Sequence, residues 1–213
     1  MALTDDDVKR AVELVLNKYG NHLPAGVASA IRGKKPTDIV RLLPASQYRP
    51  QFDQYYRSFF AAINSKAFGV TFTLDIADDD AEVCGSFNCP AFCSPAVLNT
   101  GRLIYVNLDE DNTFATLCHE LCHYISHGNF YPEFYAMGGE NPKILEGVTE
   151  YLTRNLSTAV RDERARKEKY QAWYEAVTKA MVAGGQGELD MIRFALRGEY
   201  VALPNLDGVK PRG

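Results

Sequence analysis

The sequence predicts an α+β protein with helices in the N- and C-terminal parts of the chain and a small mixed β-sheet between them. Apolar residues recur at helical spacing up to about residue 66, alternate with polar residues at 70–76, and return to helical spacing from residue 112. A run of strands beside runs of helices is typical of α+β domains. We therefore expect an N-terminal helical region, 1–68, packed on a domain formed by 69–213 as one structural unit.

The N-terminal region should begin with a helix capped by Thr4. Asp7 occupies its third position, a variant of the capping box, and apolar residues then recur as far as Tyr19. Shorter helices are expected at 24–32 and 36–43, and a longer one at 50–66. This last helix carries a broad apolar stripe that we expect in the core, formed by Phe52, Tyr55, Tyr56, Phe59, Phe60 and Ile63.

Short strands are expected in the middle of the chain, at 70–76, 84–87, 92–98 and 103–108. Pro95 lies within the third of these and Pro90 just before it. Because proline lacks the backbone donor that a central strand needs, 89–99 should form a sheet edge or an irregular rim.

The rest of the chain should be helical. We expect helices at 112–127, from 141 or 142 to 157, at 161–183 and at 188–200. A glycine cluster at 184–187 separates the last two helices. No Gly-Lys-Ser/Thr sequence follows it, so we interpret it as a turn rather than a phosphate-binding loop.

Composition excludes several classes of protein. The 213 residues are 46% hydrophobic and 23% charged, with a formal net charge of -4. No apolar run reaches the ~18 residues of a membrane span, and the acidic N-terminus is unlike a secretion signal. We therefore expect a soluble protein, cytoplasmic or delivered by a signal-peptide-independent route, without nucleic acid or membrane as its main partner.

The five cysteines, Cys84, Cys89, Cys93, Cys118 and Cys122, favour reduced thiols, because an odd number in a chain without a signal does not suggest a disulfide framework. The first three lie within ten residues of one another. They could form a structural zinc site, but they lack the usual two-residue gap; the alternative is that they are small buried side chains.

The sequence His119-Glu120-Leu121-Cys122-His123 is the most informative segment. Four residues turn an α-helix by about 400°, so His119 and His123 should share one face and reach one metal ion. Leu117, Leu121 and Ile125 should lie on the other side and anchor the helix in the core.

Glu146 and Glu150 should likewise share one face of a second helix. Like charges four residues apart repel, so a cation such as zinc beside them would explain the pair, and from the residues alone either carboxylate could be the ligand. Gly147 costs helix stability, which suggests that another element or the metal approaches closely there.

The order His119-Glu120-x-x-His123, 22 intervening residues, Glu146-Gly147 and Glu150 resembles the gluzincin class of zinc metallopeptidases, which includes thermolysin. The resemblance covers residues 103–157 and implies a zincin-like fold. It implies His119, His123 and Glu146 as zinc ligands and Glu120 as general base, with Glu150 accepting a hydrogen bond from the far nitrogen of His119. Leu145 and Glu150 replace the usual Asn and Asp.

A metzincin is the competing assignment, but Ser126 and Asn129 stand where it would need Gly and His. His127 extends the histidine stripe by one turn, but three histidines one turn apart on a straight helix cannot all bind one tetrahedral ion, so we interpret it as a histidine at the helix end. Tyr170 is our preferred donor to the oxyanion of the reaction, among candidates that also include Tyr151, Arg154, Tyr174 and His127.

The predicted mechanism is amide hydrolysis. Two histidines and one carboxylate leave zinc a position for water, whose pKa falls toward ~7, and Glu120 takes its proton. The expected substrate is a peptide or protein, docked along the Pro-interrupted rim at 92–98. A bacterial effector or toxin protease is the favoured hypothesis. A zinc hydrolase of a non-peptide or cell-wall amide and a catalytically inert zinc-binding module remain as alternatives.

Overall fold

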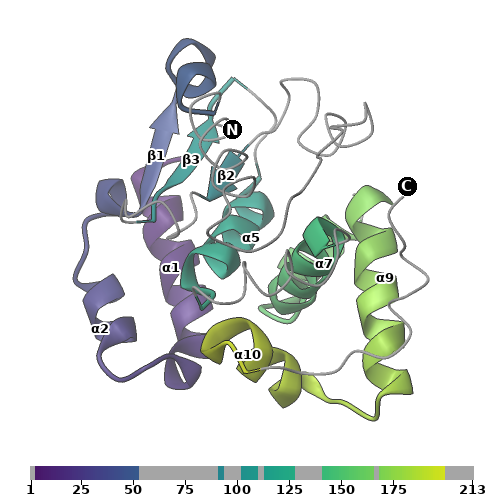
Figure 1. Cartoon of the computed structure of the whole chain (residues 1–213). Helices are drawn as coiled ribbons and strands as arrows, with labels where there is room; N and C mark the ends of the chain where they lie inside the picture. The colour runs from purple at the N-terminus through teal and green to yellow at the C-terminus, as the bar shows by residue number, and fades with distance from the viewer. Residues whose placement is uncertain are drawn as a thin grey trace, which may run out of the picture.

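The computed structural model describes residues 3–52, 91–93, 102–109, 113–127, 141–165 and 168–199. This part of the chain is mostly helical with a small sheet, as expected of an α+β protein. Its elements, several of them labelled in Figure 1, are α1 (Asp5–Tyr19), the 3-10 helix η1 (Gly20–His22), α2 (Val27–Arg32), the 3-10 helix η2 (Pro36–Asp38), β1 (Val40–Leu43), β2 (Ala91–Cys93), β3 (Ile104–Asn107), α5 (Phe114–Ile125), α7 (Asn141–Arg154), α8 (Thr158–Arg164), α9 (Glu168–Ala183) and α10 (Glu188–Arg197).

The first helix begins as predicted. The Thr4 side chain accepts a hydrogen bond from the backbone N–H of Asp7 at 3.3 Å, and the Asp7 carboxylate accepts one from the backbone N–H of Thr4 at 3.0 Å. This reciprocal capping box satisfies two amide groups that a helix start otherwise leaves unpaired. One face of α1 is buried, and it consists of Val8, Ala11, Val12, Val15, Leu16 and Tyr19.

The predicted helix at 36–43 is wrong, because only η2 is helical there and the chain then forms β1. Val40 to Leu43 pair in parallel with Ile104 to Asn107 of β3. Ile39 and Val40 are β-branched and each only 2% exposed, so burial against β3 outweighs the weak helical period of this segment.

The sheet has the order β1-β3-β2, with β2 antiparallel to β3. Among the described strands, β2 therefore lies at an edge, as the prolines predicted. The predicted strands at 70–76 and 84–87 and the remainder of 92–98 lie outside the described residues. Most of the predicted helix at 50–66 also lies outside, although 45–52 are helical and Phe52 is buried.

The expected helices around residues 112–127 and 141–157 are present as α5 and α7, and the last helix ends at Gly198, whose φ is 65°. The single helix expected at 161–183 is wrong, because the chain forms two helices there. Ser157 starts α8 by accepting a hydrogen bond from the backbone N–H of Val160 at 3.3 Å, and α8 ends at Ala165. The sequence period did not reveal this break because both helices keep buried apolar positions.

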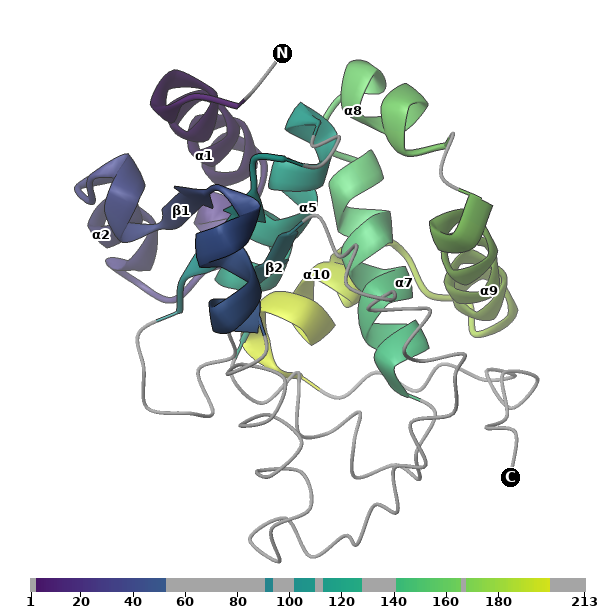
Figure 2. The same cartoon turned by 90° about the horizontal axis from the view of Figure 1, so that it is seen from above.

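Four helices form a row in the order α1, α5, α7 and α9, which is visible from the front and from above (Figures 1 and 2). Strands β2 and β3 pack on α5. The Tyr19 hydroxyl donates to the backbone carbonyl of Leu152 at 2.7 Å and so joins α1 to α7. The described residues of 1–68 and 69–213 thus share one core, with α5 at its centre.

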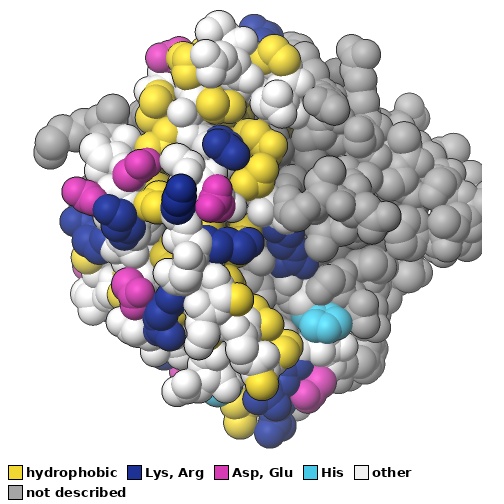
Figure 3. Space-filling model, turned by 90° about the vertical axis from the view of Figure 1, so that its left-hand side faces the viewer, with side chains coloured by type: hydrophobic (Ala, Val, Ile, Leu, Met, Phe, Trp, Pro, Cys, Tyr) yellow, Lys and Arg dark blue, Asp and Glu magenta, His cyan; other side chains and the backbone are white. Residues whose placement is uncertain are grey.

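On the face seen in Figure 3, basic and acidic side chains are intermingled around hydrophobic ones. None of the helices within the described ranges is long and apolar enough to cross a membrane.

Candidate metal centre

Helix α5 carries the His-Glu-x-x-His sequence and is fixed at both ends. Thr113 caps its start by accepting a hydrogen bond from the backbone N–H of Thr116 at 3.2 Å. At its other end, one guanidinium nitrogen of Arg102 contacts the carbonyl oxygens of His123 at 3.1 Å, Tyr124 at 2.8 Å and Ser126. A cation at the C-terminal carbonyls also complements the helix dipole.

The apolar side of α5 lies in the core as predicted, with Leu117, Leu121 and Ile125 at most 6% exposed. On the other side, His119 and His123 pack edge to face, with ring centroids 4.9 Å apart. The two imidazoles are also buried, at 1% and 5% exposure. The helix therefore places two polar rings next to each other in the interior.

Glu146 of α7 completes this group. Its Oε2 lies 3.0 Å from Nε2 of His119 and 3.4 Å from Nε2 of His123, and its Oε1 lies 3.3 Å from Nε2 of His123. The three donor groups lie within 4.8 Å of one another. The Glu146 side chain remains 22% exposed, so the group can be reached from solvent on that side.

The donor set and its spacing fit a metal ion. Ligand atoms bound to a tetrahedral zinc at ~2.0–2.1 Å lie about 3.3–3.4 Å apart. Oε2 of Glu146 lies 3.0 Å and 3.4 Å from the Nε2 atoms of His119 and His123, close to this edge length, and the whole set lies within 4.8 Å. This buried group of His119, His123 and Glu146 could therefore hold a metal ion.

One face of α7 contacts the other nitrogen of each imidazole. Thr149 Oγ1 lies 3.2 Å from Nδ1 of His123. Glu150 Oε2 lies 3.2 Å from Nδ1 of His119, which is the contact that the gluzincin resemblance implied. Of the two glutamates, Glu146 thus faces the Nε2 atoms and Glu150 faces the outer side of His119.

Glu150 is fully buried between two arginines. Arg154 Nε donates to its Oε1 at 2.8 Å, and Arg164 Nε donates to its Oε2 at 2.8 Å. Burial alone would raise the pKa of this carboxyl, but hydrogen bonds and charge from His119 and Arg164 lower it to about 2. Glu150 is therefore an ionised hydrogen-bond acceptor at neutral pH.

The side chains at this site shift the pKa values of one another. Burial opposes ionisation of Glu146, yet the neighbouring His123 and His119 hold its pKa well below the usual range. Burial and Arg164 oppose protonation of His119, but Glu146 and Glu150 raise its pKa. Glu120 is 7% exposed, and burial raises its pKa despite the nearby histidines.

The close approach to Gly147 that the sequence suggested is confirmed, and the element that approaches is α9. A Cβ atom at this position would lie 2.6 Å from Val177 Cγ2 and 2.8 Å from the backbone oxygen of Trp173. Glycine at this position lets α7 lie directly against α9 while Glu146 and Glu150 face α5.

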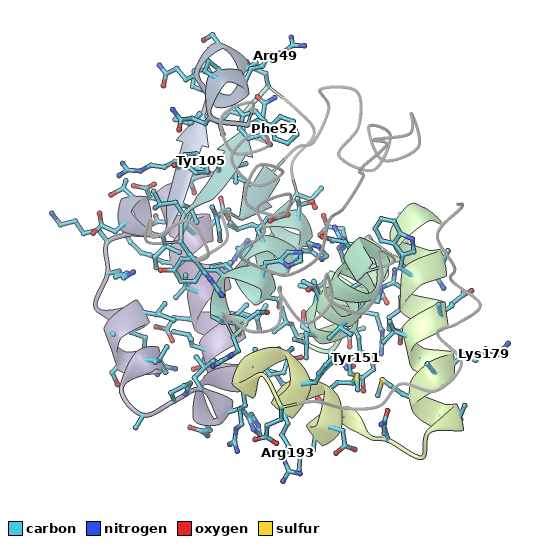
Figure 4. The ribbon with its side chains drawn as sticks, viewed as in Figure 1. Arg49, Phe52, Tyr105, Tyr151, Lys179 and Arg193 are labelled. Carbon is cyan, nitrogen blue, oxygen red and sulfur yellow. The ribbon has the colours of Figure 1, made fainter. Side chains whose placement is uncertain are left out.

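Four of the five oxyanion candidates have described side chains, and each of these makes other contacts. The rings of Tyr151 and Tyr174 stack with centroids 6.3 Å apart, and Tyr151 lies between α7 and α10 (Figure 4). Arg154 lies over the Tyr174 ring and binds Glu150. His127 packs against Gly198, and the Tyr170 side chain lies outside the described part.

Among the five cysteines, Cys118 and Cys122 are free and buried. Burial raises the pKa of Cys122 to about 12, so its thiol is neutral and unreactive at physiological pH. The side chains of Cys84, Cys89 and Cys93, and with them the possible second zinc site, lie outside the described residues.

Sequence reasoning missed Thr149 and Arg164. Thr149 could have been found, since it lies three residues after Glu146 and therefore on the same face of the helix. No local signal could have identified Arg164, because it reaches Glu150 from a separate helix.

Comparisons with protein-family models, with curated proteins and with solved structures found no match.

Proposed function

We propose that this chain is a zinc-dependent metallopeptidase of the gluzincin type with a zincin-like arrangement of sheet and helices. The proposal rests on one observation. The Nε2 atoms of His119 and His123 on α5 lie 3.0–3.4 Å from the carboxylate oxygens of Glu146 on α7. Two histidines and one carboxylate are the protein ligands of many hydrolytic zinc sites. This donor set favours an enzyme over a closed structural site.

His119, His123 and Glu146 would hold the ion. When bound, zinc supplies Lewis-acid chemistry, polarising a carbonyl and making water more acidic. Glu120 follows the ligand His119 directly and is close enough to both histidines for their charge to affect its pKa. In the proposed reaction, its carboxylate accepts a proton from the attacking water and delivers it to the departing amine nitrogen.

A peptide or protein is the proposed substrate. Strand β2 lies at an edge of the described sheet and packs on α5, which carries the histidines. An extended peptide that pairs with such an edge would lie next to the strand that packs on this helix. An effector or toxin protease that cleaves one protein is the form of this activity that we favour.

Two variants test the assigned roles. Glu120→Gln should retain stoichiometric zinc, measured by elemental analysis, and lose hydrolysis of a peptide library. Glu146→Ala should lose zinc, because two imidazoles alone bind it weakly.

Glu188→Gln provides the matched control, since Glu188, the first residue of α10, forms a surface ion pair with Lys18 of α1. It should keep both zinc and activity. Full hydrolysis by Glu120→Gln would contradict the mechanism, and the absence of zinc from the unaltered protein would contradict the proposed function as a whole.

A further inference from the structure

Arg164 of α8 is a buried cation on the Nδ1 side of His119, whose other nitrogen, Nε2, faces Glu146. The Arg164 side chain is 2% exposed. Its Nε lies 2.8 Å from Oε2 and 3.2 Å from Oε1 of Glu150, and its Nη2 contacts the same Oε2. The same Nη2 lies 3.2 Å from Nδ1 of His119. Burying a guanidinium is costly unless it is paired, and here the pairing is directed at one carboxylate.

The His119 imidazole, the Glu150 carboxylate and the Arg164 guanidinium meet at Nδ1 of His119. Their donor and acceptor chemistry decides which of these two contacts to Nδ1 is compatible with metal binding through Nε2. An imidazole that binds a metal through Nε2 carries its proton on Nδ1 and donates it to an outer partner. Arginine has donors only, so it cannot accept that proton. Two acceptors lie near Nδ1 of His119: Oε2 of Glu150 at 3.2 Å and the Thr153 hydroxyl at 3.5 Å. The Glu150 carboxylate is closer and charged, so it is the main acceptor, and Arg164 acts on His119 through it.

The guanidinium fork also fixes the orientation of the carboxylate. Nε of Arg164 lies 3.2 Å from Oε1 of Glu150 while Nη2 contacts Oε2, and two-point contacts of this kind restrict rotation in a way that a single ammonium group does not. Arg154 Nε also binds Oε1, at 2.8 Å. Glu150 is thus held on both oxygens.

Arg154 is itself anchored to other elements. Its Nη1 donates to Gln171 of α9 and its Nη2 to the carbonyl oxygen of Arg164 at 3.2 Å, while its guanidinium lies 4.4 Å from the ring centre of Tyr174. Helices α8 and α9 are therefore connected to the imidazole of His119 through Glu150.

We propose that Arg164 is a positioning residue of the metal centre, which holds His119 through Glu150 with Nε2 turned toward Glu146 and thereby sets the affinity for zinc. This inference rests on the proposed function and extends it to a residue from a third helix. Loss of such an outer partner weakens metal binding by about 10- to 100-fold in other sites.

The test is the zinc dissociation constant of the full chain, measured by competition with a chelator. Arg164→Lys keeps the charge without the fork, and Arg164→Met removes both; each should weaken binding by about 10- to 100-fold. Arg161→Met is the matched control, because Arg161 lies on the same helix with its side chain 55% exposed. It should leave the affinity unchanged.

A double-mutant cycle separates positioning from a general effect on the fold. If Arg164 acts through Glu150, Arg164→Lys should have little further effect on zinc affinity in a Glu150→Gln background. The visible spectrum of the cobalt-substituted protein should also change in Arg164→Lys and stay unchanged in Arg161→Met. If Arg164→Met does not fold, Arg164→Lys decides the question.

Full zinc affinity in Arg164→Lys, or an equal loss in both backgrounds, overturns this inference alone. Absence of zinc from the unaltered chain overturns the proposed function and this inference with it.

Discussion

Both ring nitrogens of each site histidine have a neighbour. Nε2 of His119 and of His123 face Glu146, while the Nδ1 atoms face Glu150 and Thr149 respectively. An imidazole held on both sides keeps a fixed ring orientation, which reduces the entropy lost when a ligand binds. The group is therefore organised in advance for an ion.

Thr149→Val should weaken zinc binding by about tenfold, because it removes the hydroxyl beside His123 Nδ1 while preserving side-chain shape. Titration with a competing chelator measures the change. Thr178→Val is the control, since this threonine also lies on a helix, α9, and its hydroxyl donates to the Tyr174 carbonyl at 2.8 Å. An equal loss of affinity in the two variants would contradict a specific role for Thr149.

At the scale of elements, the contact between α7 and α9 depends on one missing side chain. Gly147→Ala should destabilise the fold by about 1–3 kcal/mol, although alanine favours helices, because the added Cβ meets a backbone oxygen that cannot move independently. Urea unfolding gives the change in free energy. Gly33→Ala is the control, as the nearest atom to its Cβ would be 3.5 Å away; equal stability of both variants would refute the packing argument.

The start of α1 gives a pH-dependent contribution. The hydrogen bonds from Thr4 hold the pKa of Asp7 below its ordinary value, so the ionised carboxylate stabilises the fold above that ordinary value. This contribution is lost as the pH falls through the lowered pKa of the folded state. Thr4→Ala should therefore cost about 1 kcal/mol at neutral pH and less at a pH below the lowered pKa of Asp7.

The test is the unfolding free energy of the unaltered chain and of Thr4→Ala, each measured from neutral to acidic pH. Thr4→Ser, which keeps the cap, should match the unaltered chain. A cost for Thr4→Ala that does not change with pH would show that Asp7 contributes nothing through its charge.

Elements whose signals are local could be predicted from the sequence. The capping box of Thr4 and Asp7, the β-branched run of β3 and the spacing of His119 and His123 each depend on neighbours within one turn or one strand. β1 and the break between α8 and α9 could not be predicted, because pairing with a strand some 60 residues away and packing against α7 decide them.

At the scale of the molecule, the candidate site of His119, His123 and Glu146 joins α5 and α7, the two central helices of the row. Zinc should therefore stabilise the whole fold, by about 2.7 kcal/mol at a free concentration 100 times the dissociation constant. Thermal unfolding with and without zinc measures this effect. Glu146→Ala should show no such rise in melting temperature, and a rise of the same size in this variant would place the bound ion elsewhere.

The candidate ligands could be predicted from two short motifs, but their setting could not. Arg154 follows Glu150 by four residues on α7, so helical spacing alone brings these two together. Arg164 reaches Glu150 only because α8 folds back on α7, and no periodicity in the sequence reports that geometry. The sequence thus indicates which side chains could bind an ion, and the fold determines what holds them in place.

The hydrogen bond from Tyr19 to the Leu152 carbonyl, together with the pairing of β1 with β3, bears on any attempt to dissect the protein. A fragment that starts at residue 69 would lack both, leaving one side of α5 without its cover and a buried carbonyl without its donor. The smallest autonomous unit that can retain the packing of α5 against α7 must therefore include the first helix.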